Sequence, residues 1–266
     1  MWHNQLVRDS FCKLQQLRVY SCENLMNIFP PNMLRRLQNL ESLYIRNCNS
    51  VEEVFEIRGV NVNEICDMVS IQLRILYLCD LPKLKHVWSS DPQTMLTFQN
   101  LREVRVSRCK SLKSLFPASV AKSLEQLETL YIYDCGVEEI VAMEEGLETT
   151  TKFVFPRLIS LSLKMLPDLK CFYQGKHTLE WLSLKKLEIY KCDKVKIVAS
   201  NDLNFPNTNE LGHHLPIQQS LFLIEKVWFV LVSLLICMTS FSWAISGSNR
   251  ARLSKKIYIG WVHDHL

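Results

Sequence analysis

Glycine is scarce in this chain, and its few glycines lie far apart. Only seven occur among the 266 residues, and no two are closer than ten positions. A phosphate-binding loop needs clustered glycines, because its backbone N–H groups must approach the phosphate oxygens closely. No G-x-x-x-x-G-K-[ST] motif is present, so nucleotide binding is not expected of these residues.

Paired cysteines and glycosylation sequons are also missing. The ten cysteines include no C-x-x-C pair, and no N-x-[ST] sequon occurs. Structural zinc sites are usually built from close-spaced cysteine pairs, so none is expected here. There is no N-terminal apolar secretory segment, and unpaired thiols are typical of a reducing compartment. These absences together predict a cytoplasmic protein.

The net charge is small, and most of it lies at one end of the chain. The net charge is +4, and residues 221–266 contribute +3 of it, from five basic and two acidic side chains. The remainder is nearly neutral and lacks the basic stripe that nucleic acid would require. The His213-His214 pair, the His263-x-His265 pair and adjacent glutamates are interpreted as solvated. We therefore predict no enzyme, no catalytic or metal site and no cofactor.

One phrase, repeated seven times between Phe11 and Val198, carries most of the information in the sequence. It reads L-x-x-L-x-[IVL]-x-x-[CL]-x-x-[LV]-x-x-[IVLF]. Its two apolar residues in L-x-[IVL] lie two apart, so both point to one side of a short strand. A period of roughly 20–30 residues is typical of leucine-rich repeats, whose stacked units bury a continuous core. We therefore predict an α/β solenoid, a horseshoe arc with a parallel strand ladder on its concave face. The strands should be centred near residues 18, 44, 77, 105, 131, 162 and 188.

The residue that turns the chain inward after each predicted strand alternates between two types. It is leucine followed by proline in two repeats, Leu81-Pro82 and Leu166-Pro167, and cysteine in the other five: Cys22, Cys48, Cys109, Cys135 and Cys192. A buried cysteine behaves mainly as a small hydrophobe with a weak S–H donor. We therefore expect these thiols to be core residues.

These phrases resemble the leucine-rich-repeat region of plant intracellular immune receptors of the coiled-coil, nucleotide-binding type. The segments Leu17 to Pro30 and Phe155 to Phe172 match the phrases common in that family, and the resemblance covers about residues 11–200. It implies a non-enzymatic protein-recognition module of plant disease-resistance type. The implied partner is a pathogen effector, a host protein or the missing nucleotide-binding domain of a fuller receptor. The first repeat follows Met1 closely without a polar cap. We therefore interpret the chain as a truncated gene product or a module of a larger receptor.

The outward positions of the predicted ladder give a candidate binding face. Six of the eight tyrosines and three arginines fall in two of its columns, and these two residue types are enriched at binding hot spots. The alternative is that tyrosine is there only because it favours strands. The predicted protein-binding residues on the concave face are Arg18, Tyr20, Tyr44, Arg46, Tyr77, Arg105, Tyr131, Tyr133, Lys164, Glu188 and Tyr190.

The carboxy-terminal quarter has a different character. We divide the chain into a solenoid over 1–199, a polar linker over 200–220, a hydrophobic helix over 221–248 and a basic tail over 249–266. The uncharged run from Val227 to Ile245 is long enough to span a membrane. It can be read as a membrane anchor, as translated non-coding sequence or as a buried terminal helix.

The basic residues after the apolar run make orientation a separate question. The positive-inside tendency would place this tail in the cytosol and the repeats outside, as in a membrane-anchored receptor-like protein. Free cysteines and missing sequons oppose that alternative. The prediction is therefore a cytoplasmic protein, with membrane anchoring through the carboxy-terminal segment kept open.

Overall fold

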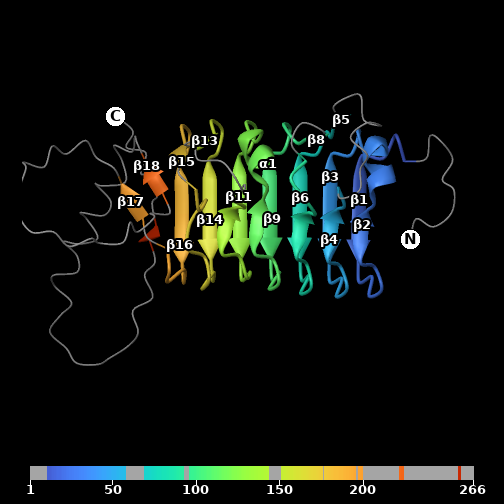
Figure 1. Cartoon of the computed structure of the whole chain (residues 1–266), viewed down its shortest axis with the longest axis horizontal. Coiled ribbons are helices and arrows are strands. Elements are labelled where there is room, and N and C mark those ends of the chain that lie inside the picture. Colours follow the sequence, from blue (N-terminus) through green and yellow to red (C-terminus); the bar gives the residue numbers. More distant parts are fainter. Residues whose placement is uncertain are drawn as a thin grey trace, which may run out of the picture.

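The repeats form a stack of coils joined by a ladder of parallel strands. This computed structural model describes residues 11–57, 69–92, 96–143, 151–175, 177–195, 197–199, 222–224 and 257–258. Seven strands lie side by side along the long axis (Figure 1) and pair in parallel in chain order. They are β1 (Gln16–Tyr20), β3 (Ser42–Arg46), β6 (Ile75–Cys79), β9 (Glu103–Ser107), β11 (Thr129–Tyr133), β14 (Ser160–Lys164) and β16 (Lys186–Tyr190). Every strand is centred where the repeat predicted it.

The L-x-[IVL] pairs fix the register of this ladder. In β3, Leu43 and Ile45 are fully buried, whereas Tyr44 between them points outward. Leu43 aligns with Leu17 on one side and Leu76 on the other. A slip of one residue would expose the buried set and bury the outward set, so the apolar spacing selects a single register.

The opposite side of the first five coils carries a second set of short parallel strands. One sheet contains β2 (Asn27–Phe29), β4 (Glu53–Phe55) and β7 (His86–Trp88), and another contains β10 (Ser114–Phe116) and β12 (Glu139–Val141). Buried aromatic rings stack along them, with centroids 5.4 Å apart for Phe29 and Phe55 and 5.8 Å for Phe55 and Trp88. The side of these coils opposite the ladder is therefore also built from strands.

Short elements close the third side of the coils. They comprise one 3₁₀ helix, η1 (Pro31–Arg36), one α-helix, α1 (Ala118–Lys122), and the strands β5 (Val69–Ser70), β8 (Leu96–Thr97), β13 (Thr151–Val154), β15 (His177–Glu180), β17 (Ile197–Ala199) and β18 (Phe222–Ile224). The last four strands form one sheet in the order β13-β15-β18-β17.

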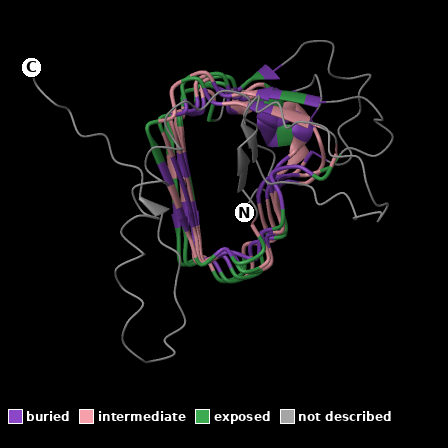
Figure 2. Ribbon diagram, turned by 90° about the vertical axis from the view of Figure 1, so that its left-hand side faces the viewer, coloured by how far each residue is buried: buried purple, intermediate pink, exposed green. Residues whose placement is uncertain are grey.

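The stack is straighter than the predicted horseshoe. Viewed along the long axis, the coils superimpose closely (Figure 2). Curvature arises when helices about 10 Å wide line one side and strands about 4.8 Å apart line the other. Here short strands line both sides in most coils, so neighbouring coils are spaced similarly on the two sides and rotate little.

Each ladder strand ends in a residue with left-handed backbone geometry. We call these residues the turn row: Ser21, Asn47, Asp80, Arg108, Asp134, Met165 and Lys191, with φ between 52° and 55°. The N–H of Asn47 donates to the carbonyl of Cys79 at 3.1 Å, and that of Met165 donates to the carbonyl of Tyr190 at 2.7 Å. The left-handed turn thus continues the hydrogen bonding of the ladder by one residue while the chain leaves the strand.

A glycine accommodates the one repeat that is a residue short. Gly136 follows Cys135 and passes so close to the preceding coil that an added Cβ would lie 2.0 Å from the carbonyl oxygen of Lys110. Its N–H donates to the carbonyl of Cys109 at 3.2 Å. A side chain at this position would separate the two coils.

The carboxy-terminal predictions fall mostly outside the described residues. The predicted linker and the run from Val227 to Ile245 lie there entirely. Of the predicted helix over 221–248, only Phe222–Ile224 is described, and it is strand β18, because its backbone pairs in parallel with β17. The helix prediction is wrong for these three residues. In the basic tail, β19 (Ile257–Tyr258) pairs antiparallel with β16. No helix in the described part of the chain is long and apolar enough to cross a membrane.

A candidate protein-binding face

The outward side chains of the seven parallel strands form one continuous surface, which we call the ladder face. Its middle column runs in register from Arg18 through Tyr44, Tyr77, Arg105, Tyr131 and Ser162 to Glu188. All eleven predicted binding residues lie on these strands. They do not form one site, however, because their contacts divide them into three groups.

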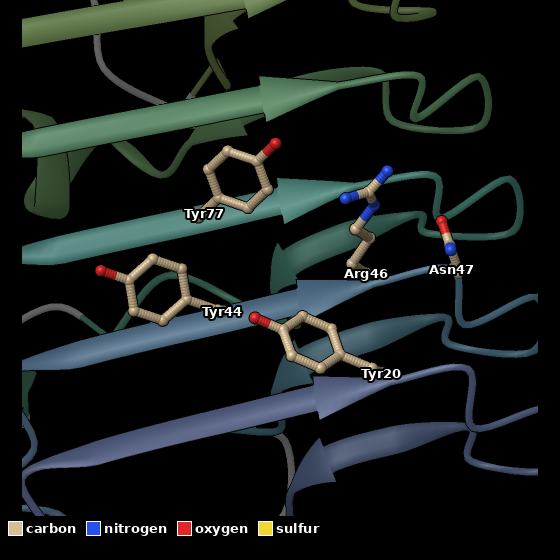
Figure 3. Close-up of a pocket in the computed structure, with 5 residues that line it drawn as sticks. All are labelled: Tyr20, Tyr44, Arg46, Asn47 and Tyr77. Atoms are coloured by element: carbon tan, nitrogen blue, oxygen red, sulfur yellow. The ribbon is translucent and has the colours of Figure 1, made fainter.

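The first group surrounds a shallow hollow at the β1 end. About 440 Å³ is lined by Tyr20, Tyr44, Arg46, Asn47 and Tyr77. Figure 3 shows the three phenol rings standing on three successive strands, with Arg46 at the end of β3 and Asn47 one residue beyond. Four of these five residues were predicted. Aromatic rings and a guanidinium beside an open hollow are typical of a surface that binds another protein.

The rings of the hollow are held by their neighbours. The centroids of Tyr44 and Tyr77 are 6.1 Å apart, and the Arg18 guanidinium carbon lies 5.1 Å from the centroid of Tyr44. Burial raises the pKa of Tyr77, and its contact with Cys79 acts in the same direction. Tyr77 therefore remains a neutral O–H donor at physiological pH. Tyr20 is the most open of the three, with 51% of its surface exposed.

The second group lies in the middle of the ladder face. The Arg105 guanidinium carbon is 5.9 Å from the centroid of the Tyr131 ring, and the rings of Tyr131 and Tyr133 stack with centroids 6.3 Å apart. Arg105 also forms an ion pair with Glu103 on its own strand. The charge of this arginine is thus already compensated.

The third group lies at the β16 end. The Nζ atoms of Lys164 and Lys186 lie 2.9 Å and 3.2 Å from the carboxylate of Glu188, and the Ser162 hydroxyl donates to it at 3.0 Å. Desolvation raises the pKa of Glu188, but these three contacts outweigh it and leave the pKa below its ordinary value. Tyr190 contacts Lys191, whose Nζ lies 5.3 Å from the ring centroid.

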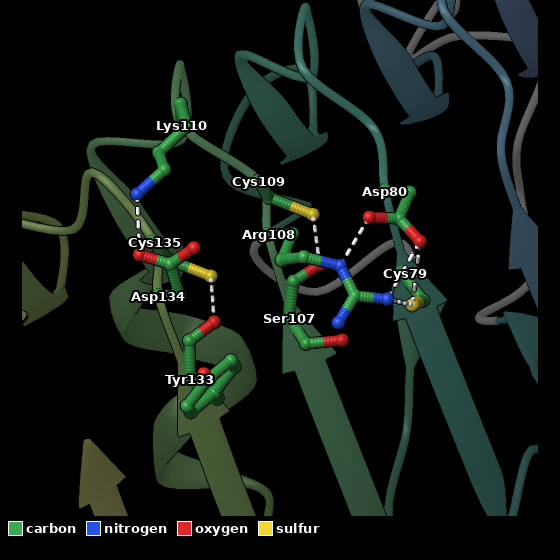
Figure 4. A network of polar contacts seen from close by, with 9 residues as sticks. All are labelled: Cys79, Asp80, Ser107, Arg108, Cys109, Lys110, Tyr133, Asp134 and Cys135. Atoms are coloured by element: carbon green, nitrogen blue, oxygen red, sulfur yellow. Dashed lines mark hydrogen bonds and ion pairs between the residues drawn. The ribbon is translucent and has the colours of Figure 1, made fainter. Parts of the chain in front are cut away.

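A polar network runs along the edge of the face at the strand ends (Figure 4). Arg108 binds both carboxylate oxygens of Asp80, one of them at 2.7 Å, and its other contact is the Cys79 thiol at 3.1 Å. Lys110 pairs with Asp134 in the same way across neighbouring coils. The hydrogen bond from Arg108 lowers the pKa of Asp80. That carboxylate is therefore ionised, and both of its oxygens are bound by Arg108.

Four of the five repeat cysteines are buried, as predicted, whereas Cys22 in the first coil is only partly buried. Cys48 and Cys109 are fully buried, and each thiol donates to the carbonyl oxygen two residues earlier, at 3.3 Å to Arg46 and 3.4 Å to Ser107. All eight cysteines in the described residues are free. Burial raises the pKa of the Cys192 thiol, which disfavours the reactive thiolate.

Two of the acidic and thiol features noted in the sequence can be located in the described part of the chain. No group of three or more His, Cys, Asp or Glu side chains there could hold a metal ion. Of the adjacent glutamates, Glu138 is a partly exposed carboxylate bound by Lys113 at 2.8 Å and Lys170 at 2.7 Å. It links three coils by ion pairing.

Sequence reasoning missed Asn47 and the Asp80–Arg108 pair. Asparagine tolerates left-handed geometry better than most residues, so an asparagine directly after a predicted strand was the available signal for the turn row. The ion pair gave no such signal, because its partners are 28 positions apart in the chain.

The parallel ladder and the buried L-x-[IVL] pairs define a leucine-rich-repeat solenoid. Residues 1–136 match the family described as plant disease resistance protein RPS2-like, leucine-rich repeats. The chain belongs to that family.

A curated relative extends the comparison to a whole protein. A probable disease resistance protein of Arabidopsis thaliana is 27% identical over 123 residues, which are 45% of this chain and 13% of the relative. The chain thus aligns with only a small part of the relative's length. No solved structure matches the chain significantly.

Proposed function

We propose that the chain is a non-enzymatic recognition module of plant disease-resistance type that binds a protein partner through the ladder face. The observation that carries this proposal is the hollow lined by Tyr20, Tyr44, Arg46, Asn47 and Tyr77. The partner is a pathogen effector, a host protein or the nucleotide-binding domain of a fuller receptor. Family membership supports the defence role.

The dimensions of the ladder face suit such a partner. Seven strands about 4.8 Å apart give a face roughly 30 Å long, which is enough for an interface of standard size. Tyrosine supplies large contact area at low entropic cost, because its side chain has few rotatable bonds. The ladder strands are also hydrogen-bonded on both sides from β3 to β16, so a partner meets a surface that is already ordered.

A cytoplasmic location fits the chemistry of the interior. The described cysteines are unpaired, and five of them occupy the same repeat position, which is buried in four of those five coils. Free buried thiols are typical of proteins from reducing compartments. We therefore place the proposed recognition event in the cytoplasm.

Photocrosslinking tests the proposed face directly. A benzophenone amino acid replaces Tyr44 on the ladder face or, as a control, the exposed Lys85 beside β7 on the other sheet, in the full chain expressed in plant tissue. We expect discrete protein adducts after irradiation only from position 44. Adducts from position 85, with none from position 44, would move the binding surface to the other side of the coils.

A further inference from the structure

The β1 end of the ladder face carries positive charge that the described structure leaves uncompensated. On the outward positions of β1, β3 and β6, the charged side chains are Arg18 and Arg46. Neither forms an ion pair within the described residues: Arg18 lies over the Tyr44 ring, and Arg46 is exposed beside the hollow. These three strands carry no carboxylate.

The remaining cations of the face have acidic partners. Arg105 pairs with Glu103, and Lys164 and Lys186 share Glu188. The carboxylate whose pKa Arg46 helps to lower is that of Asp80, but Arg108 binds both of its oxygens. Asp80 is therefore not available as a close partner for Arg46.

We infer that the hollow takes an acidic peptide segment of the protein partner. Its carboxylates would meet Arg18 and Arg46, and an apolar or aromatic side chain would lie among the rings of Tyr20, Tyr44 and Tyr77. This inference rests on the proposed function and specifies the chemistry of the partner. An exposed guanidinium binds a carboxylate through two parallel N–H donors, which gives both affinity and orientation.

The composition of the hollow favours a peptide over a free anion. Three aromatic rings line it beside a single arginine and an amide, whereas an anion site would surround its ligand with donors. The hollow is also open along the strands, and Asn47 at its edge can donate to a peptide carbonyl. A peptide thus uses both the apolar and the charged parts of the surface.

Selection from a random peptide library displayed on phage tests the inference with the full chain as bait. We expect selected peptides to contain more Asp and Glu than the unselected library, and this excess should disappear with the double variant Arg18→Gln, Arg46→Gln. A selected acidic peptide should bind the double variant about tenfold more weakly or worse, because both charged donors to its carboxylates are lost. Its affinity should also fall as salt rises, since both arginines are near solvent.

Arg105→Gln is the matched control, since it removes a ladder-face arginine that already has an acidic partner. It should leave the acidic excess intact, and Arg46→Lys should restore part of the affinity by returning the charge. Selected peptides without an acidic excess would overturn this inference while leaving protein binding by the face in place. An excess that survives the double variant would locate acidic recognition elsewhere. Competition by inorganic phosphate at matched ionic strength would make the hollow an anion site, which also overturns the inference, and so would the absence of any selected peptide.

Discussion

At the β1 end of the ladder face, Arg18 and Arg46 have no acidic partner in the described structure, while at the β16 end Lys164 and Lys186 both contact Glu188. The two ends share one strand geometry and one buried register. The difference therefore lies only in the outward positions, which the fold leaves free to vary. A repeat scaffold can thus confine a candidate binding chemistry to a few coils while the others neutralise their own charges.

The largest expected effect is a loss of stability at the β1 end that leaves the β16 end folded. Phe55 is fully buried between Phe29 and Trp88 under the β1 end, and Phe55→Ala should cost about 3–5 kcal/mol. Because coils contact mainly their neighbours, the end coils should open first. Hydrogen exchange should show lost protection in β1 and β3 with protection kept in β14.

The control for that experiment is Leu182→Ala, which changes a side chain that is 70% exposed and should alter stability by less than about 0.5 kcal/mol. Equal loss of protection at both ends after Phe55→Ala would show that the coils unfold as one unit.

A second substitution acts between the two ends, where the coils of β9 and β11 meet. Gly136→Ala would place a Cβ 2.0 Å from the Lys110 carbonyl oxygen, so the coils must move apart at a cost of roughly 1–3 kcal/mol. Chemical denaturation should show the loss. Adding Lys110→Ala should not restore stability, because the contact is with the backbone; a full rescue would mean that the Lys110 side chain causes the effect.

The turn row should respond differently at the two ends. Met165 is a poor residue for left-handed geometry at φ 54°, and Met165→Gly should stabilise by about 0.5–1 kcal/mol by relieving that strain. Asn47 tolerates the same geometry, so Asn47→Gly should change the free energy of unfolding by less. Thermal unfolding of both variants measures the contrast, and equal shifts would show that side-chain strain is not the cause.

The smallest expected effect concerns pH. Hydrogen bonds from Lys113 and Lys170 lower the pKa of Glu138 to about 2. A carboxylate with a lowered pKa stabilises the folded state above its ordinary pKa of 4.5 and loses that contribution as the pH falls toward 2. The melting temperature of the wild type should therefore be slightly higher than that of Glu138→Gln at neutral pH. The difference should vanish near pH 2, the lowered pKa of Glu138. High salt should shrink it as well, because Glu138 is partly exposed and both lysines are exposed.

The positions of the ladder strands could be predicted because burial of every second residue leaves a direct record in the sequence. Leu43 and Ile45 show that record clearly, and the outward residues Tyr44 and Arg46 follow from it. The same argument placed four of the five residues that line the hollow.

Other features of the structure have no signal in the local sequence. Strand β4 is three residues long and buries both Val54 and Phe55, so it lacks the alternation that identifies a strand. Arg108 and Met165 adopt left-handed geometry because of the coil beside them, although neither residue type favours it. Arg46 lacks an acidic partner in the described structure because Arg108 already binds Asp80. Such a pairing across 28 positions cannot be read from residue types.

The regular parallel ladder has a further consequence for any extended segment that lies along the stack. Neighbouring strands are about 4.8 Å apart, whereas an extended peptide advances about 3.3 Å per residue, so three residues of peptide match two coils closely. Side chains of an extended segment alternate between two sides, so those three residues apart face opposite ways. The next side chain that faces the ladder in the same register lies about six residues on, about four coils away. The ladder would then distinguish partners by the periodicity of their sequence as well as by their composition.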